Sequence, residues 1–591
     1  MNIKALLARI GVTLTIALGI SLWLCVSPGI EAQAASLAQP TPIKEVFPDS
    51  NFAERIREGL GKASVDDVVT QAELNQIYSL DSPQRNIQSI EGIQYMNNLE
   101  MIRMQGNNIN DISQLSGITS LTNIGLTNND LTDISPLGNL TNLKTLTLGD
   151  NNISDLSSLT TLSNLLYLAI NNNNVSSFND LSGLTSLIRL DANGVSVSDL
   201  NPLSNLTNLD RLELSENGIS DISPLANLTK LNYLKLTDNN ISDISVIANL
   251  TDMWGLYLGN NNITDITALT NLTGLNELHL SDNDIENASI VANLTNLNEL
   301  QLDNTNISNI DYLASLTNVE YLYLGNNQIS DITSLHTLSN LHFLDLDNNQ
   351  ISDISSLPSN SWYMKVQVRN QEITNNPINF QTDLVIPNNI IDDSGVIISP
   401  ATISDNGVYA SPNLTWNLTG YQSEVSYTFN KEGDNALFSG MVKQPLIGEY
   451  NVIFNVDDVE TQEKAIVDTL LTEPTPPTKE GYTFTGWYDA KTNGTKWDFD
   501  TDKMPAKDIT LYAQFSVNKS PKDDDTDKET PGDDVNKPER QGTDVKNPET
   551  TTENRVNILL PKTGDSQNPL VIFMGLFLLG TGIISLHKIR N

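Results

Sequence analysis

Apolar and polar positions repeat with a period of 22 residues through the middle of the chain. The period runs without gaps over twelve copies, from the copy that begins at Leu99 to the one that begins at Leu341, and a degenerate earlier copy begins at Ile77. Each copy has the form L-x-x-L-x-L-x-x-N-x-I-x-D-I-x-x-L-x-x-L-x-x. Self-similarity at this period predicts a stack of coils, because one coil buries its apolar side chains only against its neighbours.

The copy over residues 231–252 shows which elements the pattern predicts. Leu234 and Leu236 alternate with Tyr233 and Lys235, which is typical of a short strand with one buried face. About a dozen residues remain for the return path, so 3₁₀ turns are expected there rather than a long α-helix. The Ser-Pro pairs at 135–136 and 223–224 favour such turns, with Ser as the cap and Pro in the first position. We therefore predict a leucine-rich repeat solenoid over residues 77–362, with a parallel β concave face and a 3₁₀ convex face.

Asparagine recurs at the ninth position of most copies. Its amide donates and accepts hydrogen bonds, so we expect a buried ladder that satisfies the backbone where each coil bends. Val195 and Thr305 interrupt the series, and a valine cannot replace the amide, so the backbone near Gly194 should be irregular. The predicted ladder comprises Asn107, Asn129, Asn151, Asn173, Asn217, Asn239, Asn261, Asn283, Asn327 and Asn349.

Different patterns flank the repeats on both sides. Residues 51–60 and 70–78 read as short amphipathic helices with capping signals at Asp49 and Thr70, which predicts a helical N-terminal cap over 35–76. After the repeats, β-rich runs at 413–418, 425–429 and 449–454 predict an Ig-like β-sandwich over 363–456. Further runs at 481–488 and 509–515 predict a small β module over 457–517. Residues 518–557 have few apolar side chains and should form a disordered linker that spans the wall.

The two ends of the chain read as targeting segments. Lys4 and Arg9 precede the apolar run 14–26, and Ala32 and Ala34 form a small-x-small cleavage site, which predicts a signal peptide over 1–34. Cys25, the only cysteine, lies in this segment, so the mature chain would have no thiol. At the other end, residues 558–591 combine the motif LPKTG, an apolar run at 570–586 and a short basic tail. The motif consists of Leu560, Pro561, Lys562, Thr563 and Gly564.

This C-terminal arrangement is similar to the sorting signal of wall-anchored Gram-positive proteins. A sortase thiolate would attack the carbonyl carbon of Thr563 and release Gly564, and a peptidoglycan amine would then take the acyl group. The apolar run would serve as a transient membrane-retention segment. The expected location is therefore the cell surface, with covalent attachment to peptidoglycan after secretion.

The net charge of the chain argues against two classes of binding partner. The formal net charge of −39 argues against nucleic acid, whose phosphates need Lys and Arg, and against binding anionic lipid through a basic patch. The charge either keeps the chain dispersed through self-repulsion or forms an acidic docking surface. Solubility is the simpler explanation, and it requires no partner.

The combination of helical cap, 22-residue repeats and sandwich resembles the internalin family of bacterial surface proteins. The resemblance rests on residues 47–49 (FPD), 67–70 (DVVT), the Asp-Ile pair of the repeat and residues 438–440 (FSG). The segment 486–488 (GWY) is similar to the small β-grasp repeats that such proteins carry. The resemblance implies an adhesin that binds a host-cell protein through the concave face, with a role in adhesion, invasion or virulence.

The C-terminal half of the predicted concave face carries many aromatic side chains. Aromatic residues bury a large area at low entropic cost and are enriched among interface hot spots. Alternatively, tyrosines suit strands and pack against each other across them, and Trp254 packs against the strand edge. The candidate partner-binding residues are Tyr233, Trp254, Tyr257, His279, Tyr321, Tyr323 and Phe343, and their charged neighbours are Arg189, Arg211, Glu213, Glu277 and Asp345.

An enzyme and a passive wall protein are the competing classes. His279, His336 and His342, the only histidines between the signal peptide and the sorting signal, form no evident triad with a Ser and an Asp, and no phosphate-binding loop appears. The cluster Asp345, Asp347 and Asp353 either binds Ca²⁺ weakly or is a solvated surface, and it lacks EF-hand spacing. We therefore predict a non-enzymatic protein without cofactor, metal or catalytic residues. The alternative is a passive wall-structural protein or a wall-modifying enzyme.

Overall fold

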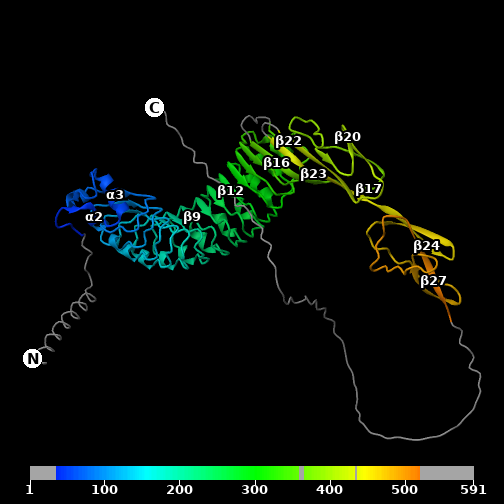
Figure 1. Ribbon diagram of the computed structural model, residues 1–591, viewed down its shortest axis with the longest axis horizontal. Helices are drawn as coiled ribbons and strands as arrows, with labels where there is room; N and C mark the ends of the chain where they lie inside the picture. The colour runs from blue at the N-terminus through cyan, green and yellow to red at the C-terminus, as the bar shows by residue number, and fades with distance from the viewer. Residues whose placement is uncertain (1–34, 359–364, 433–435, 519–591) are drawn as a thin grey trace, which may run out of the picture. The chain divides into compact units, whose positions relative to one another are not determined.

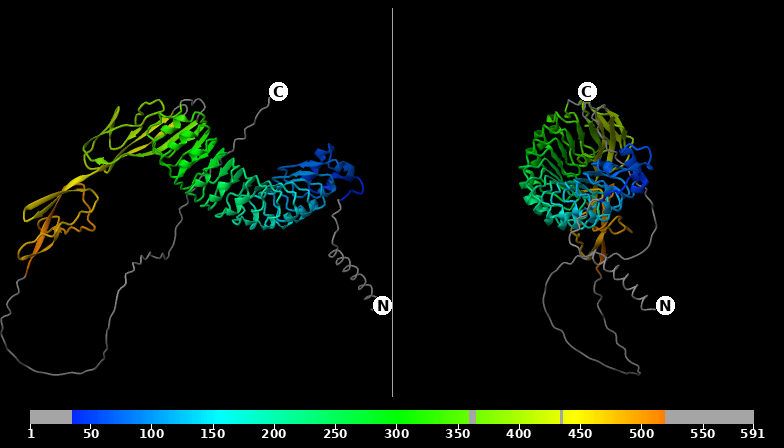
Figure 2. Two further views of the ribbon diagram at one scale, coloured as in Figure 1. Left: turned by 180° about the vertical axis from the view of Figure 1, so that it is seen from behind. Right: turned by 90° about the vertical axis from the view of Figure 1, so that its left-hand side faces the viewer.

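The repeats form a stack of coils joined by one parallel sheet. The computed structural model describes residues 35–358, 365–432 and 436–518. Successive strands pair in register exactly one repeat apart in sequence, as in Tyr233↔Gly255↔Glu277, and Figures 1 and 2 show the strands side by side along the stack. The strands are β3 (Ser79–Asp81), β4 (Met101–Arg103), β5 (Asn123–Gly125), β6 (Thr145–Thr147), β7 (Tyr167–Ala169), β8 (Arg189–Asp191), β9 (Arg211–Glu213), β10 (Tyr233–Lys235), β11 (Gly255–Tyr257), β12 (Glu277–His279), β13 (Glu299–Gln301), β14 (Tyr321–Tyr323), β15 (Phe343–Asp345) and β16 (Lys365–Thr374).

Short 3₁₀ helices form the return path, as the repeat length predicted. Each contributes a buried apolar side chain, such as Leu225 or Ile247, to the core that also contains the inward strand residues. The leucine-rich repeat solenoid is confirmed. The helices are η1 (Ile93–Tyr95), η2 (Ser113–Leu115), η3 (Ser135–Asn139), η4 (Ser157–Thr161), η5 (Asn179–Leu181), η6 (Asn201–Leu203), η7 (Ser223–Asn227), η8 (Ser245–Asn249), η9 (Thr267–Leu269), η10 (Ala288–Asn293), η11 (Asp311–Ser315) and η12 (Thr333–Thr337).

The residue that caps these helices is the aspartate of the repeat. The serine of each Ser-Pro pair was predicted to cap, but Ile134 precedes η3 and no side chain of the N-cap residue bonds the backbone. Instead, Asp133 Oδ1 accepts a hydrogen bond from the N–H of Ser135 at 2.8 Å. The same bond recurs along the stack, so the Asp-Ile pair has a structural role. It is made by Asp111, Asp155, Asp199, Asp221, Asp243, Asp265, Asp331 and Asp353.

The predicted asparagine ladder is present. Asn151 Oδ1 accepts from the N–H of Leu131 at 3.0 Å, and Asn151 Nδ2 donates to the carbonyls of Leu126 and Leu148 at 3.0 and 2.9 Å. Each amide therefore links its own coil to the preceding one. The sequence analysis missed a further rung: Gln371 Oε1 accepts from the N–H of Ile351 at 2.9 Å.

The backbone is irregular where valine interrupts the ladder, as predicted. Gly194 and Ser196 both have positive φ, 64° and 59°, whereas a regular coil such as the one around Asn128 has one such residue. Asn217 Oδ1 accepts from the N–H groups of both Val195 and Val197, at 3.0 and 3.4 Å.

The N-terminal cap closes the first coil. Asp49 accepts from the N–H groups of Asn51 and Phe52, and Thr70 forms a capping box with Glu73, so both predicted caps are confirmed. Gly92, with φ 98°, lets the first coil approach the cap, because a Cβ there would lie 2.3 Å from the Val46 carbonyl oxygen. The cap elements are β1 (Thr41–Pro42), α2 (Ile43–Val46), α3 (Ser50–Gly59), β2 (Val68–Val69) and α4 (Gln71–Leu74).

The solenoid sheet continues into the β-sandwich through β16. This strand pairs with β15 and also, in parallel, with β23, and β22 and β19 follow in antiparallel order. A second sheet has the order β18-β21-β20, and the side chains between the sheets belong to the same core as the solenoid. The further strands are β17 (Ile378–Asn379), β18 (Asp383–Pro387), β19 (Thr402–Ile403), β20 (Val408–Ala410), β21 (Asn413–Asn417), β22 (Glu424–Glu432) and β23 (Ala436–Ile447).

The last described unit has a core of its own around Trp487 and Leu511. Its strands are β24 (Glu449–Val456), β25 (Val459–Ile466), β26 (Tyr482–Tyr488) and β27 (Ile509–Val517), in the order β25-β24-β27-β26. The run 449–454 was predicted as a strand of the sandwich, but β24 pairs with β25 and β27 instead. The boundary proposed at 456–457 therefore moves to the Gly448 region.

Candidate functional site on the concave face

Outward side chains of the sheet form two columns along the concave face. Because the strands pair in register, the first residues of successive strands lie next to each other, and so do the third residues. From β10 to β15 the first column contains Tyr233, Gly255, Glu277, Glu299, Tyr321 and Phe343, and the second contains Lys235, Tyr257, His279, Gln301, Tyr323 and Asp345.

Three of the predicted aromatic residues form a continuous row. The ring centroids of Tyr233 and Tyr257 are 4.9 Å apart, and those of Tyr257 and His279 are 4.3 Å apart. Gly255 provides the space between the tyrosines, because a Cβ there would lie 3.0 Å from Tyr233 Cδ2 and 3.3 Å from Tyr257 Cε2. The rings therefore restrict one another's positions.

A second aromatic group lies on the last two repeat strands. Tyr323 and Phe343 are 5.0 Å apart, and Tyr321 stacks on His342 at 6.3 Å. Tyr321 keeps 38% of its surface exposed. Trp254, just before β11, is 45% exposed, so it is not buried against the strand edge. This part of the face therefore contains both aromatic rings that pack against each other and aromatic side chains that are partly exposed to solvent.

Charged side chains connect the first aromatic row to the preceding strands. The Arg211 guanidinium lies 3.6 Å from the centroid of the Tyr233 ring and pairs with Glu213 at 2.6 Å. Arg189 pairs with Asp191 at 2.6 Å and approaches Glu213 at 3.6 Å. Burial would raise the pKa of the Glu213 carboxyl, but the bonds from Arg211 and Asn193 lower it below its usual value. The network is charged and fixed at neutral pH.

Two neighbouring carboxylates in the first column have opposite pKa shifts. Burial raises the pKa of Glu277, whose carboxylate accepts a hydrogen bond from the Tyr257 hydroxyl. His279 Nε2 lies 3.1 Å from Glu299 Oε1, and this contact lowers the pKa of Glu299. Gln301 Nε2 donates to the same Glu299 oxygen at 2.8 Å. These polar groups are therefore largely satisfied by one another.

The sequence analysis missed three residues of this face. Tyr167 lies in the first column on β7, and its hydroxyl donates to Asp191 Oδ2 at 2.8 Å. Burial, followed by this bond, raises the pKa of Tyr167 to about 12. Leu166 and Ile188, at the second position of successive repeats, are 36% and 43% exposed. Their positions in the 22-residue repeat could have identified them, because Tyr167 occupies the same position as Tyr233, and Leu166 and Ile188 the same position as Trp254.

The structure brings none of the three histidines together. His279 contacts Glu299, His342 lies 3.6 Å from Glu320, and His336 Nδ1 is 2.6 Å from the Thr333 carbonyl oxygen. In the part of the chain that the structure describes, no group of three or more His, Cys, Asp or Glu side chains is arranged to bind a metal.

The three candidate calcium ligands make other contacts. Asp347 pairs with Arg369, Asp353 caps the turn at Ser355, and Asp345 accepts from the N–H of Asp347 at 2.9 Å. These contacts of the three carboxylates therefore stabilise the last coil.

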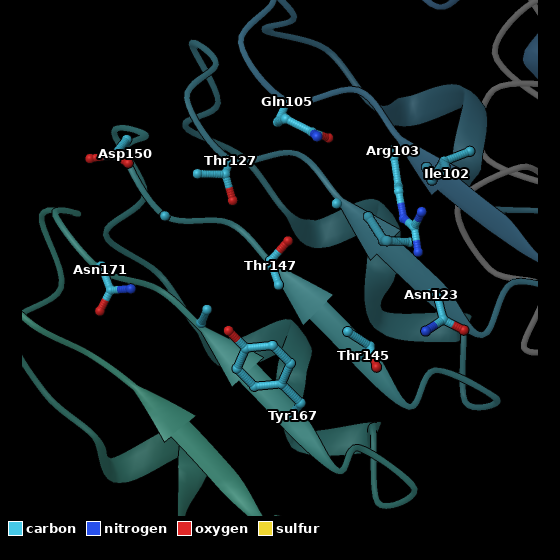
Figure 3. A pocket seen from close by; sticks show the side chains of 14 residues that line it. Ile102, Arg103, Gln105, Asn123, Thr127, Thr145, Thr147, Asp150, Tyr167 and Asn171 are labelled. Carbon is cyan, nitrogen blue, oxygen red and sulfur yellow. The ribbon is translucent and has the colours of Figure 1, made fainter. Parts of the chain in front are cut away.

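The N-terminal half of the concave face contains a hollow. It has a volume of about 440 Å³ and is lined by short side chains of β5, β6 and β7, with Arg103 and Tyr167 at its ends (Figure 3). The sequence analysis assigned no role to this region, since it contains few aromatic residues.

The predicted targeting segments are not part of the described structure. The sorting motif 560–564 and the apolar run 570–586 lie outside the described residues. Within the described ranges, no helix has the length and apolar character needed to cross a membrane.

Four family models match the chain. The model described as "Bacterial adhesion/invasion protein N terminal" matches residues 30–75, and the model described as "Leucine Rich repeats (2 copies)" matches 119–161, 207–249, 295–335 and 317–359. The model "LRR adjacent" matches 395–447, and the Listeria-Bacteroides repeat domain matches 450–514. The last two ranges agree with the corrected position of β24.

Known proteins match over different lengths of the chain. Internalin H of Listeria monocytogenes is 59% identical over 157 residues, which is 26% of this chain and 29% of that relative. The crystal structure of an internalin, InlF, from L. monocytogenes is 42% identical and covers 56% of this chain and 98% of its own, with a TM-score of 0.54. The functional domain of InlJ from the same species, at 23% identity and a TM-score of 0.52, matches 70% of this chain and 100% of its own and shows the fold alone. This chain belongs to the internalin family of leucine-rich repeat surface proteins of the adhesion and invasion type.

Proposed function

We propose that this chain is a wall-anchored, non-enzymatic adhesin that binds a host-cell surface protein through strands β10 to β15 of its concave face. The observation that supports the proposal most strongly is the row Tyr233, Tyr257 and His279, whose ring centroids lie 4.9 and 4.3 Å apart while all three residues remain half-buried rather than fully covered. Aromatic side chains that are already ordered lose little conformational entropy on binding.

The dimensions of this surface suit a protein partner. Six strands at a spacing of ~4.8 Å extend over roughly 24 Å, which suits a protein surface better than a small molecule. Tyr321 and Phe343 provide apolar anchors at one end, and Arg211 and Glu213, on the adjacent strand β9, provide fixed charges beside the other end. Because the charges are paired within the chain, they contribute mainly to partner selection rather than to affinity.

Affinity capture tests the protein-binding proposal. The full chain and the variant Tyr257→Ser/Tyr321→Ser/Phe343→Ser are used as bait against surface extracts of host cells. We expect one protein to bind the wild type and not the triple variant. The control Tyr78→Ser/Tyr482→Ser, which removes two exposed tyrosines outside this surface, should still capture it. Release of a wall glycan or peptide instead of capture would favour the enzymatic alternative.

We infer wall attachment from the motif 560–564 in its sequence context. Acyl transfer would join the Thr563 carbonyl to a peptidoglycan amine and release the segment that begins at Gly564. The measurement is mass spectrometry of the C-terminal peptide after digestion of the wall of a sortase-bearing bacterium. The expected peptide ends at Thr563 linked to a wall fragment, and a Thr563→Ala chain should appear in the medium. A wild-type chain recovered intact through residue 591 would contradict the inference.

A further inference from the structure

The two halves of the concave face differ in how their polar groups are used. From β8 to β13 many polar and charged side chains bond to each other, as in Arg189–Asp191, Arg211–Glu213 and Gln301–Glu299. In the hollow of the N-terminal half, the side-chain groups of Arg103, Gln105, Thr127, Thr145 and Thr147 make no hydrogen bond to any described residue. The hollow therefore offers free donors and acceptors on a rigid sheet.

Small residues create the space. Gly125, Thr145, Thr147 and Ala169 occupy four of the six outward positions of β5, β6 and β7, whereas rings and long polar or charged side chains occupy most of these positions in the C-terminal half. Figure 3 shows Thr145 and Thr147 among the side chains that line this hollow. Its volume of about 440 Å³ lies within the range of roughly 300–1,000 Å³ that is usual for ligand sites.

Arg103 provides a positive charge at one end of the hollow. Among the described arginines it is the one whose guanidinium bonds neither to a carboxylate nor to a carbonyl of the described chain. The formal net charge of the chain is −39, and yet this exposed cation remains unpaired on the sheet. A free guanidinium is suited to bind a carboxylate in a bidentate manner.

Tyr167 forms the opposite wall. One side of its ring is covered by the Arg189 guanidinium at 4.6 Å, and its hydroxyl is held by Asp191 at 2.8 Å. The neighbouring residue on the other side is Thr145, which is too short to cover the ring (Figure 3). A fixed aromatic surface therefore faces the hollow, where it can pack against the C–H groups of a sugar ring.

We propose that this hollow binds an acidic oligosaccharide. One sugar ring packs on Tyr167, sugar hydroxyls bond to the threonine, asparagine and glutamine side chains, and a sugar carboxylate pairs with Arg103. Arg103 and Tyr167 lie three strands apart, roughly 14 Å, which requires more than a single sugar unit. The free threonine hydroxyls and the Gln105 amide both donate and accept, as a polyhydroxylated ligand requires. The carboxylate in the lining, Asp150, already accepts a hydrogen bond from Asn172 Nδ2 at 2.7 Å. This site shares no residue with the protein-binding surface of β10 to β15.

Titration of the full chain with defined oligosaccharides tests the proposal. The ligands are 3′-sialyllactose and a hexuronate-containing tetrasaccharide, compared with neutral lactose and maltotetraose and with an acidic hexapeptide. We expect at least one acidic sugar to bind, with neutral sugars at least tenfold weaker. Arg103→Gln should remove that preference for acidic sugars. Thr145→Trp, which fills the hollow, should abolish binding, and thermal unfolding should show that both variants are folded.

A matched control separates this site from the protein-binding surface. Tyr321→Ser, on β14, should leave sugar binding unchanged, and Arg103→Gln should leave capture of the host protein unchanged. Equal affinity for acidic and neutral sugars, no binding of any sugar, or binding of the acidic peptide alone would each overturn the proposal. If the wild-type chain captured no host protein, the sugar titrations would still decide this proposal. The two proposals can therefore fail separately.

Discussion

Single asparagine side chains determine how neighbouring coils are joined. Asn151 satisfies an N–H of the preceding coil and carbonyls on both sides of the bend, all of them buried. The recurrence of the residue made this ladder predictable, and so did the irregular backbone at Gly194. The contacts of Arg211 with Tyr233 and Glu213 were not predictable, because they depend on which rotamers long side chains adopt across the sheet.

Removing one rung should lower stability. In Asn151→Ala the buried N–H of Leu131 loses its partner, whereas the Leu126 and Leu148 carbonyls each keep a donor from the neighbouring rungs. We expect the free energy of unfolding to fall by about 2 kcal/mol. Urea unfolding measures the change. In the matched control Asn142→Ala, an exposed asparagine loses one bond to the Thr119 carbonyl, and the cost should stay below about 1 kcal/mol. Equal costs for the two variants would show that the ladder has no special role.

Gly255 offers a second test at the scale of the residue. In Gly255→Ala the new Cβ would lie 3.0 Å from Tyr233 Cδ2, so the tyrosine rings must shift although the strand is unchanged. We expect near-UV circular dichroism to change and host-protein affinity to fall about tenfold, or ~1.4 kcal/mol. In the control Gly259→Ala the nearest atom lies at 3.4 Å, and affinity should be retained. Wild-type affinity in Gly255→Ala would show that the ring positions do not matter.

At the scale of the element, an aspartate determines where each convex turn begins. The repeat length predicted short turns, but the sequence analysis assigned the cap to serine. Asp133 makes the bond because its side chain bridges to the N–H two residues later, which leaves the serine hydroxyl unnecessary. The strand β24 also differed from its prediction, because alternation shows that a strand exists but not which sheet it joins.

The aspartate bonds predict acid sensitivity. Hydrogen bonds from the backbone or side chain at the turn lower the pKa of Asp111, Asp155, Asp221, Asp243, Asp265 and Asp331. A depressed folded-state pKa stabilises the fold above the unfolded-state value, and this contribution is lost as pH falls through the folded-state value. The urea midpoint should therefore decrease below about pH 4.

A variant with asparagine at these six positions provides the comparison. Asparagine keeps the acceptor oxygen but does not titrate in this range. The urea midpoint of the variant should therefore depend less on pH between 6 and 3 than that of the wild type. The slope of the midpoint against pH is compared, rather than its absolute value, because the variant also carries less negative charge. Identical slopes for the two chains would rule out these aspartates as the source of the acid sensitivity.

At the scale of the whole molecule, one core extends from the helical cap through the coils into the sandwich. A solenoid exposes apolar surface at both ends, and here α3 covers the first coil while β16 and β23 extend the sheet beyond the last. The sequence predicted this order because caps, repeats and sandwich have different periodicities. It did not predict the hollow near Thr145, because the hollow forms where several adjacent strands lack large outward side chains, and no single repeat shows this.

The central claim is that the aromatic surface of β10 to β15 binds the host protein. The most direct test is an equilibrium titration of the captured host protein against the wild-type chain, the variant Tyr257→Ser/Tyr321→Ser/Phe343→Ser and the control Tyr78→Ser/Tyr482→Ser. Hot-spot residues each contribute about 2 kcal/mol or more, so we predict that the triple variant binds at least roughly a hundredfold more weakly. The control should keep the wild-type Kd. A triple variant that is folded and binds with the wild-type Kd would contradict the claim.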